Sequence, residues 1–475
     1  MTTIASRSEH PMYHPGMLIL KLRPAAEASS FASFTSRSET IAIPSASPGS
    51  SALSMFERAG LIKRVVPLTQ QTVQERTVAA SRGMLGALSV PTTPPPATDY
   101  RTGVNIIEIE QDSELHNLQI ALANDPGVES VSRVPVRYLH MSGTGVAAAP
   151  PPASTMWNLR QIQWDQARVL PNFQEATQIR VAVLDSGIQP DHPDLQGQVN
   201  GYTFQHPDLS GVSSNLDLIG HGTHVAGTIA ASINNNLGIN GVCDCQILAW
   251  KIFDDQPDSF RNGNEFKFTY FVDPVMYRRA LADCVDQRVD VVNLSIGGGG
   301  APDFEEQMLF NSLLANGTTV VASMGNERQL GSPTSYPAAI PGVIAVGATD
   351  RLDRVASFSN AGNHISLSAP GVAIWSTLPT YPGQTGFEAE FRNGRLIPGE
   401  PERRENDYAA WQGTSMASPH VAAAAALLLA NKGRMSGAQV RTRLEETADK
   451  VPAMGRADWH IDYGVGRLNL LRLLG

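Results

Sequence analysis

Hydrophobic and polar positions follow one pattern from about residue 155 onward. Short apolar runs with the pattern of buried strands are RVAVLDSG, ILAWKIF, VDVVNLSIGG, TTVVASMGN and GVIAVGAT. Between them lie stretches with helical spacing, HVAGTIAASI, PVMYRRALADCVDQ and PDFEEQMLFNSLLANG. Strands that are apolar on both faces and alternate with helices predict an α/β fold, a parallel sheet covered by helices on each side. In such a sheet we expect the functional site beyond the carboxyl ends of the strands, where these runs end in Gly, Asp, Ser or Asn.

The earlier part of the chain predicts a separate, smaller α+β domain. MLILKL, LIKRVV, VNIIEIE and VESVSRV have the pattern of short strands, and DSELHNLQIALAND that of a helix with an Asp cap. Segments rich in Pro, Ser, Ala and Thr cannot pair regularly, and they occupy roughly 36–53, 91–98 and 143–154. We therefore expect a domain over 1–142 with flexible insertions at roughly 24–58 and 68–100, a linker over 143–154 and a second domain over 155–475.

Charge and composition narrow the class of function by exclusion. The net charge of −9 argues against a phosphate-binding surface, so we expect no nucleic-acid partner. No apolar run reaches the roughly 18 residues of a membrane-spanning helix. The start of the chain lacks the pattern of a secretory signal, which predicts synthesis in the cytoplasm, followed either by secretion through an unconventional route or by action inside the cell. Cys243, Cys245 and Cys284 are an odd and sparse set that gives no disulfide framework, and no second Cys or His pair lies at zinc-like spacing, so we expect buried thiols.

Three polar residues stand where predicted strands and helices end or begin. Asp185 ends VAVLD, His221 opens HGTHVAGTIAASI, and Ser415 opens the apolar run TSMASPHVAAAAALLLA. A serine hydroxyl becomes a nucleophile when an imidazole takes its proton, and a carboxylate best orients that imidazole. The small residues around all three allow a substrate to approach closely. The alternative for Ser415 is a simple helix cap, with Pro419 in the first helical turn, where no N–H is needed.

The segments that carry these residues resemble a known enzyme family. VAVLDSGIQPDHPDL, GHGTHVAGTIA and GTSMASPHVA are similar to the three signature segments of the subtilisin-like serine peptidases, in that family's order. The resemblance covers about 155–475 and extends to TADKV and YGVGRLNL near the end. It implies a subtilisin-like sheet flanked by helices and a serine endopeptidase that hydrolyses peptide bonds through an acyl-enzyme intermediate.

The resemblance also implies a role for each catalytic residue. Ser415 would be the nucleophile, His221 the general base and then acid, and Asp185 the orienting carboxylate. VVASMGNE resembles the segment that supplies an oxyanion donor, which assigns that role to Asn326 with help from the Ser415 N–H and, more weakly, the Thr414 hydroxyl. The alternative for Asn326 is an ordinary turn residue.

Substrate recognition is implied by a further resemblance. VVNLSIGG is similar to the strand that pairs with the substrate backbone, so Ser295, Ile296 and Gly297 would bind protein or peptide substrates along a cleft. Two segments depart from the family core, 254–273 and 380–407, and each contains an Asn-Gly hairpin signal. They are expected either to rim the cleft or to form solvated surface excursions.

A metal site is implied only by resemblance. INNNLGI is similar to the family's calcium loop, with a ligand set of the Asp194 carboxylate, the Asn235 side chain and the carbonyls of Ile233, Leu237 and Ile239. Oxygen ligands of this kind suit a structural Ca²⁺ ion. The family's remaining ligand lies near the mature N-terminus, where this chain offers Ala153, so an ion-free loop stays the alternative.

The region before the linker resembles the end of an inhibitory prodomain. In the family, such a small ferredoxin-like α+β domain assists folding, and its last strand lies in the cleft like a product. On that resemblance LQIALANDPGVESVSRVPVRYLHM implies a self-inhibited precursor, with its own N-terminal domain as intramolecular inhibitor and cleavage within about 140–154. Two alternatives are a catalytically silent homologue that only binds peptides, and an N-terminal domain that serves as a separate interaction module.

Overall fold

The structure is a computed structural model of the 475-residue chain, and it describes residues 11–23, 51–68, 103–110, 112–143, 156–204, 215–233, 235–262 and 265–475. The described residues form a smaller unit, residues 13–134, and a larger unit that holds nearly all residues from 135 onward. The sequence predicted a boundary at residue 142, and the difference is the segment 135–142, which pairs with strands of the larger unit. The segment 91–98 and most of the two insertions and the linker lie outside the described residues.

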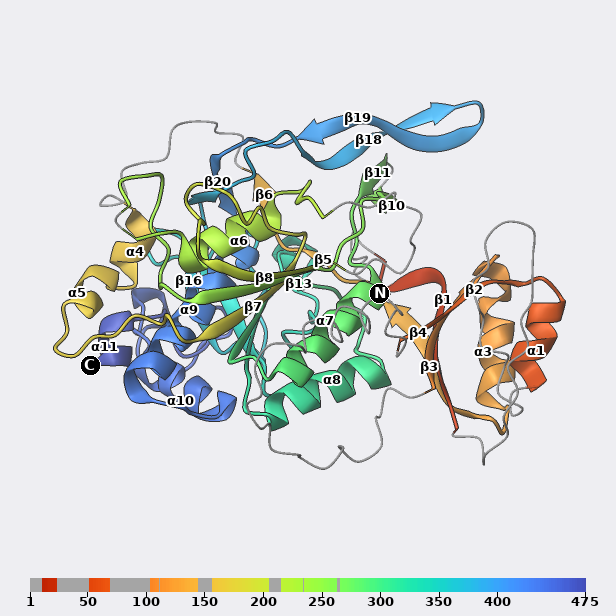
Figure 1. The fold of residues 1–475 in the computed structure, drawn as a ribbon, viewed down its shortest axis with the longest axis horizontal. Coiled ribbons are helices and arrows are strands. Elements are labelled where there is room, and N and C mark those ends of the chain that lie inside the picture. The colour runs from red at the N-terminus through yellow and green to blue at the C-terminus, as the bar shows by residue number, and fades with distance from the viewer. Residues whose placement is uncertain are drawn as a thin grey trace, which may run out of the picture. The chain divides into compact units, whose positions relative to one another are not determined.

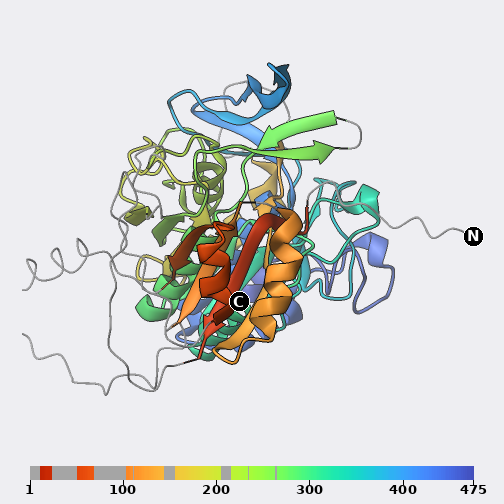
Figure 2. The ribbon, with the colours of Figure 1, turned by 90° about the vertical axis from the view of Figure 1, so that its right-hand side faces the viewer.

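The smaller unit is a four-stranded sheet with two helices. Its elements are β1 (Tyr13–Leu22), α1 (Ser51–Arg58), β2 (Ile62–Pro67), β3 (Val104–Ile109), α3 (Leu115–Ala123) and β4 (Val128–Pro135). The strand order β2-β3-β1-β4 gives the β-α-β-β-α-β connectivity of ferredoxin-like folds. Both helices cover one face of the sheet (Figures 1 and 2) and bury Leu53, Leu118 and Leu122 against Leu18 and Leu20.

Helix α1 corrects one expectation, because it lies within a stretch that the sequence analysis assigned to an insertion. The segment SALSMFER is only eight residues long and begins beside Ser- and Pro-rich sequence, so its own helical signal is weak. Leu53 and Phe56 are spaced to share one face of a helix, and both are buried in the core of the smaller unit. Packing on the sheet therefore stabilises a helix that the local sequence does not mark.

The larger unit is built on a seven-stranded parallel sheet of order β16-β15-β14-β12-β7-β9-β8. The strands are β7 (Arg180–Asp185), β8 (Val199–Phe204), β9 (Gln246–Lys251), β12 (Val291–Leu294), β14 (Thr319–Ser323), β15 (Ile344–Thr349) and β16 (Leu367–Pro370). The parallel sheet of the predicted α/β fold is confirmed. Two strands were not expected: β8 contains Asn and Gly, and β16 is only four residues long.

Helices cover both faces of this sheet. They include α6 (His221–Ala230), α7 (Pro274–Gln287), α8 (Phe304–Ala315), α9 (Thr414–Lys432) and α10 (Gly437–Thr447), with the short helices α4 (Trp157–Gln161), α5 (Trp164–Arg168) and α11 (Leu470–Leu474). The chain moves from β7 towards one edge of the sheet and then returns past β7 to β12. This reversal leaves α6, which joins β8 to β9, packed against α9. It also creates a switch point between β7 and β12, where ligands of such sheets bind.

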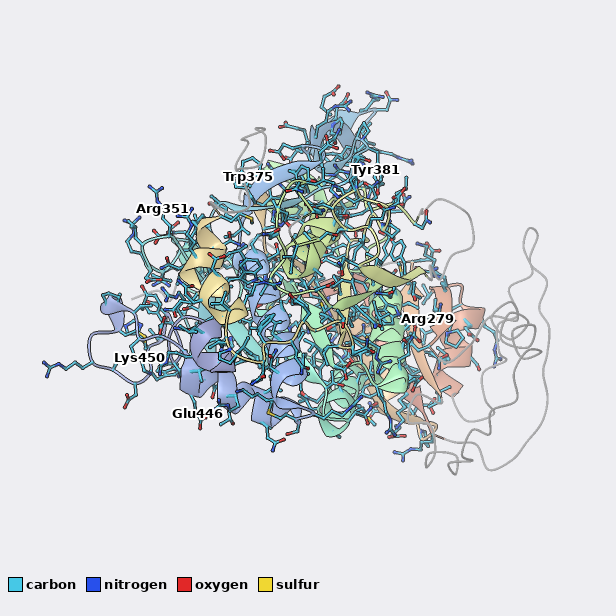
Figure 3. All side chains as sticks on the ribbon, turned by 60° about the vertical axis from the view of Figure 1, so that its left-hand side comes forward. Arg279, Arg351, Trp375, Tyr381, Glu446 and Lys450 are labelled. Atoms are coloured by element: carbon cyan, nitrogen blue, oxygen red, sulfur yellow. The ribbon has the colours of Figure 1, made fainter. Side chains whose placement is uncertain are left out.

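Helix α9 forms the centre of the larger unit's core. Its residues 414–429 are all buried, and it packs on α6 and on the central strands (Figure 1). The side chains of Arg351 and of Glu446 on α10 lie outside this core, as Figure 3 shows.

Two hairpins and a second small sheet complete the larger unit. β10 (Asp258–Asn262) and β11 (Glu265–Thr269) form one hairpin, and β18 (Gln384–Arg392) and β19 (Arg395–Arg403) form the other. The turn Asn393-Gly394 has φ of 52° and 75°, the positive values of the type I′ turn that Asn-Gly favours. The hairpins join through β11 and β18 into one four-stranded sheet (Figure 1). Nearby, β17 (Ile374–Thr377) pairs with β20 (Tyr408–Gln412).

Two simple expectations can be compared with the described residues. No helix among them has the length and apolar character needed to cross a bilayer. Cys243, Cys245 and Cys284 are buried and free, and burial raises the pKa of the Cys243 and Cys284 thiols.

Candidate active site

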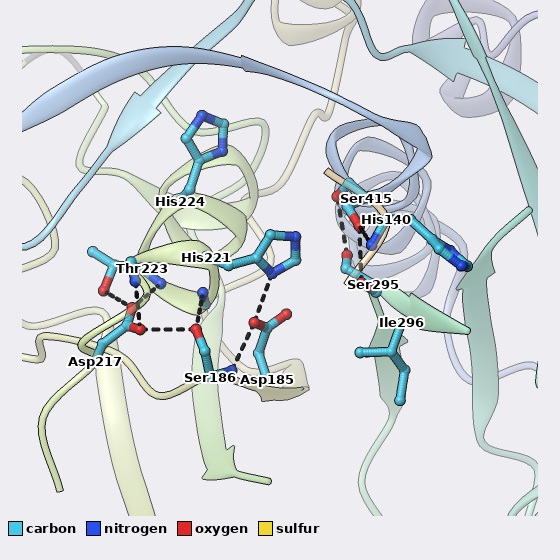
Figure 4. A network of polar contacts seen from close by, with 12 residues as sticks. His140, Asp185, Ser186, Asp217, His221, Thr223, His224, Ser295, Ile296 and Ser415 are labelled. Atoms are coloured by element: carbon cyan, nitrogen blue, oxygen red, sulfur yellow. Dashed lines mark hydrogen bonds and ion pairs between the residues drawn. The ribbon is translucent and has the colours of Figure 1, made fainter. Parts of the chain in front are cut away.

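An acid and an imidazole meet at the carboxyl end of the central sheet. Asp185 is the last residue of β7, and His221 is the first residue of α6. Asp185 Oδ1 lies 2.7 Å from His221 Nδ1 and accepts a 2.7 Å hydrogen bond from the Ser186 N–H. Both side chains are fully buried (Figure 4). The carboxylate therefore favours the tautomer in which Nδ1 carries the proton and Nε2 is left to accept one.

A second buried carboxylate, Asp217, holds the start of α6. It accepts hydrogen bonds from the Gly220 N–H (2.8 Å), the Thr223 N–H (2.9 Å) and the Thr223 and Ser186 hydroxyls (2.6 and 2.8 Å). Ser186 Oγ in turn accepts from the Gly222 N–H, as the dashed lines in Figure 4 show. Asp217 thus satisfies N–H groups that a helix start leaves unpaired and fixes the backbone that carries His221. The sequence analysis missed it, although an Asp just before a predicted helix is a capping signal.

Ser415 lies at the start of α9 and is tied to the segment after β12. Its hydroxyl donates a 2.8 Å hydrogen bond to the Ser295 carbonyl, and the Ser295 hydroxyl donates a 3.0 Å bond to the Ser415 carbonyl. Pro419 explains why that carbonyl is available. It lies beyond the first helical turn, contrary to expectation, and its missing N–H leaves the Ser415 carbonyl without the usual helical donor.

Residues 136–143, which we call the docked segment, pair with the larger unit on both sides of Ser415. β5 (Tyr138–Leu139) is antiparallel to β13 (Ile296–Gly297), with Leu139 opposite Ile296 and Tyr138 opposite Gly297. β6 (Ser142–Gly143) is antiparallel to β20, with Ser142 opposite Gln412. The predicted substrate strand therefore pairs with a stretch of this same chain.

His140 lies between these two paired stretches and faces Ser415 (Figure 4). Its carbonyl accepts a 3.2 Å hydrogen bond from the Ser415 N–H, and its own N–H donates to Ser415 Oγ over 3.1 Å. Gly413, at φ 153°, precedes α9, and a Cβ there would overlap the His140 carbonyl oxygen. Glycine at this position thus permits a peptide carbonyl to approach the start of the helix.

Asn326 is oriented by Thr414 beside the same helix start. Its Oδ1 accepts hydrogen bonds from the Thr414 N–H (3.0 Å) and the Thr414 hydroxyl (2.9 Å). These two bonds fix the Asn326 amide group, so its NH₂ end is turned away from Thr414. The sequence analysis named the Thr414 hydroxyl as a weaker oxyanion donor. That hydroxyl donates to Asn326 Oδ1 instead, so Thr414 acts here as a positioning residue.

The His140 side chain is enclosed by residues that follow β12 and by residues at and after the end of β14. Its Nδ1 lies 2.8 Å from Ser323 Oγ, and its Nε2 lies 3.8 Å from Glu327 Oε1. A Cβ on Gly297 would overlap the imidazole, so glycine makes room for the ring. Burial is the main cause that lowers the pKa of His140, and His221 and Arg137 lower it further against the opposing effect of Glu327. The pocket therefore holds a neutral imidazole.

The polar residues form two separate hydrogen-bonded groups. One joins Asp185 to His221, and the other joins Ser295, Ser415 and His140. Among the residues that the structure describes, His221 Nε2 has no hydrogen-bond partner. In Figure 4 the His221 ring extends from α6 on the side of the site where Ser415 lies, with no dashed line between them. The structure thus brings the acid to the imidazole and the serine to the docked segment.

Comparisons with known proteins agree with this arrangement. The model of the subtilase family matches residues 176–466, more than half of the chain. The chain belongs to the subtilase family of serine peptidases. It is 37% identical over 295 residues to subtilisin of Bacillus pumilus, covering 62% of this chain and 89% of the relative.

Some relatives extend well beyond the region that matches this subtilase. Subtilisin E of Bacillus subtilis is 36% identical over 295 residues, but the match spans 62% of this chain and only 64% of that relative. Fervidolysin of Fervidobacterium pennivorans, described as a keratinolytic enzyme related to subtilisin, has a solved structure with a TM-score of 0.62 and 24% identity. That match covers 98% of this chain and 62% of fervidolysin, and it supports the fold.

The candidate calcium loop of this subtilase folds onto Asp194. The Asn235 amide donates to Asp194 Oδ1 (2.7 Å), and the Ile239 N–H donates to Asp194 Oδ2 (2.9 Å). Asn235 Oδ1 accepts the Leu237 N–H (2.9 Å), so the side-chain oxygens expected to bind the ion, including those of Asp194, already accept protein donors. In this arrangement hydrogen bonds within the protein hold the loop, which begins at Ile233. Within the described ranges, no three His, Cys, Asp or Glu side chains gather as a metal site.

Three further histidines of this subtilase have structural partners. His224 stacks on Trp411 with ring centroids 5.1 Å apart and bonds the Ile374 carbonyl, and burial lowers its pKa to about 3. His420 Nδ1 bonds the Met416 carbonyl, and burial lowers its pKa to about 4. His192 bonds the Asp407 carbonyl. They stay neutral at pH 7 and belong to the fold.

Proposed function

We propose that this subtilase is made as a self-inhibited precursor and that it cleaves its own chain between His140 and Met141. The observation that carries the proposal is the hydrogen bond from the Ser415 N–H to the His140 carbonyl. A peptide held by paired strands on both sides of that carbonyl has the placement of a bound substrate.

In the proposed reaction Ser415 attacks the His140 carbonyl carbon. A rotation about χ1 takes the hydroxyl from the Ser295 carbonyl towards His221 Nε2, which accepts its proton as the C–O bond forms. Asp185 stabilises the resulting imidazolium. His221 then gives the proton to the nitrogen of Met141, the C–N bond breaks, and the acyl-enzyme is later hydrolysed by water. Protein and peptide substrates would be cleaved in the same way.

The oxyanion of this reaction would form at the His140 carbonyl oxygen. The Ser415 N–H already donates to that oxygen, and the fixed NH₂ group of Asn326 is the proposed second donor. Donors that are held in place before the reaction stabilise developing charge without reorganisation, and one such donor typically contributes about 10²–10³ to turnover.

The smaller unit is the proposed prodomain. β4 runs directly into the docked segment, so cleavage after His140 would leave a product whose last residue still occupies the site. This arrangement favours an intramolecular inhibitor over a separate interaction module. A silent peptide-binding homologue is disfavoured, since Asp185, His221, Ser415 and Asn326 are all present. We assign no role to calcium.

Active-site labelling tests the proposed function. We expect purified, processed enzyme to take up one fluorophosphonate group per chain on Ser415, because only an activated serine attacks that reagent at a useful rate. The measurement is intact mass followed by mapping of the adduct. Labelling of the precursor is expected to be slower, since His140 occupies the site. Processed enzyme that never forms an adduct would contradict the hydrolase assignment.

The inhibitory product is expected to bind more weakly at low pH. Burial lowers the pKa of His140 from its ordinary value of 6.5, so the docked state prefers the neutral ring. Binding is therefore at full strength above pH 6.5 and weakens as the pH falls below it. We expect the inhibition constant of the peptide Val-Arg-Tyr-Leu-His to rise by up to about tenfold between pH 7.5 and pH 5.5, relative to the same peptide ending in Gln. Dividing the inhibition constant of the His peptide by that of the Gln peptide cancels the pH dependence of the enzyme itself. A quotient that does not change with pH would contradict a neutral docked imidazole.

A further inference from the structure

The docked segment carries an arginine whose side chain is enclosed by the larger unit. Arg137 is the fourth residue before the proposed cleaved bond, and only 1% of its surface is exposed. A guanidinium is almost never fully buried without a partner that matches its charge and shape. Its surroundings therefore need an explanation.

Glu306, on helix α8, meets this guanidinium with both carboxylate oxygens. Arg137 Nε donates to Oε1 over 3.1 Å, and Nη2 donates to Oε2 over 2.7 Å. Each side chain is 1% exposed. Two parallel charge-assisted bonds of this kind recognise the planar fork of arginine and cannot be reproduced by the point charge of lysine.

Two further groups complete the enclosure, which we call the Arg137 pocket. The Tyr277 hydroxyl, from α7, donates to Glu306 Oε1 over 3.1 Å and holds the carboxylate in position. The Gly300 carbonyl accepts from Arg137 Nη1 over 2.8 Å. Glu306, Tyr277 and Gly300 all belong to the enzyme side of the proposed cleaved bond, so the pocket remains after the docked segment leaves.

Main-chain bonds decide which residue of a bound peptide reaches this pocket. The Val272 N–H donates to the Arg137 carbonyl over 2.9 Å, and the next residue, Tyr138, lies opposite Gly297. These bonds use backbone atoms that every peptide possesses. A substrate that pairs in the same register therefore places its own fourth residue before the cleaved bond at Glu306.

The hairpin insertion lines the neighbouring position. Val136 and Tyr138 of the docked segment pack with two phenylalanines of this insertion. Phe260 lies on β10, and Phe271 follows β11. The insertion at 254–273 therefore contacts the docked segment, which favours the expectation that it rims the cleft.

We propose that Glu306 is a specificity-determining residue and that this enzyme selects substrates with arginine at the fourth position before the cleaved bond. The inference rests on the proposed function and names its substrate class. When the docked segment leaves, the buried Glu306 carboxylate loses the Arg137 guanidinium. A substrate guanidinium in the same register can restore the two charge-assisted bonds to Glu306 and gains binding energy by doing so. A neutral side chain of the same shape gains far less.

The test compares two quenched fluorescent peptides on processed full-chain enzyme. One contains Val-Arg-Tyr-Leu-His-Met-Ser-Gly, and the other has citrulline, a neutral isostere, in place of arginine. Active sites are counted by fluorophosphonate labelling, and kcat/KM is measured per labelled site. We expect the arginine peptide to be cleaved about 10- to 100-fold more efficiently, the size of effect typical of hydrogen bonds to a charged group.

Matched variants assign the preference to the pocket. Glu306→Gln keeps the shape and removes the charge, so the arginine-to-citrulline ratio is expected to fall close to one while cleavage of the citrulline peptide persists. Glu445→Gln breaks a half-buried ion pair with Arg441 on α10 and is expected to keep the wild-type ratio. Should Glu306→Gln fail to fold, the two peptides on the wild-type enzyme still decide the question.

Each outcome supports or overturns the assignment. A large ratio in the wild type that Glu306→Gln abolishes supports it. Labelled enzyme that cleaves both peptides equally well overturns the Arg137 pocket and leaves the peptidase assignment intact. Enzyme that takes no label and cleaves neither peptide overturns both. Equal ratios in wild type and Glu306→Gln would assign the preference to other residues and overturn the role of Glu306.

Discussion

Replacing Ser415 by alanine is expected to lower kcat/KM for every peptide substrate by about 10⁴–10⁶, the loss typical when a nucleophile of this kind is removed. The reason is local. Ser415 Oγ lies at the start of α9 within hydrogen-bond distance of the His140 N–H, and among the described residues that face the His140 carbonyl it is the group suited to attack. The measurement is hydrolysis of the arginine peptide by wild type and variant at equal protein concentration.

Folding of the Ser415→Ala variant must be shown separately. The fold is expected to persist, because the side chain loses a single hydroxyl and the Ser415 N–H bond to His140 remains. Ser312→Ala, which removes a hydroxyl bonded to Met308 on α8, is the matched control and should keep full activity. A Ser415→Ala enzyme that retains a tenth of the wild-type rate would overturn its role as nucleophile.

Replacing Asp185 by asparagine is expected to lower kcat by about 10⁴. The amide keeps the volume of the carboxylate but removes the negative charge that stabilises the His221 imidazolium. Its NH₂ group can also face His221 Nδ1, which favours the tautomer that cannot accept a proton from Ser415. The measurement is kcat with saturating peptide at several pH values.

The control for this substitution is Asp165→Asn, an exposed aspartate on α5, which should leave kcat unchanged. Labelling of the Asp185→Asn enzyme should be slowed by a similar factor, because the same proton transfer activates Ser415. A loss of less than tenfold would show that His221 does not depend on this carboxylate.

The proposed catalytic residues could be singled out in the sequence because short segments carry them. Asp185, His221 and Ser415 each lie at the end of a strand or the start of a helix, among small residues whose order is distinctive. Helix α7 was predicted with its bounds because Asp273 caps it and Pro274 occupies its first turn. Local signals of this kind are independent of the rest of the fold.

Individual contacts between distant parts of the chain could not be predicted, although the resemblance implied that the end of the N-terminal domain lies in the cleft. Arg137 and Glu306 are 169 positions apart, and no local sequence pattern around either residue indicates that they pair. The placement of His140 against Ser415 depends on strands β13 and β20, which are short and gain their regular structure from tertiary packing. Helix α1 was missed for the same reason, since the sheet of the smaller unit stabilises it.

The central claim is that Ser415 acts on the bond between His140 and Met141 of its own chain. Intact mass spectrometry of purified wild type and Ser415→Ala tests it most directly. The account predicts that the wild type yields one fragment ending at His140 and another beginning at Met141, whereas Ser415→Ala stays in one piece. A cut at any other bond in the wild type, or the same cut in Ser415→Ala, would contradict it.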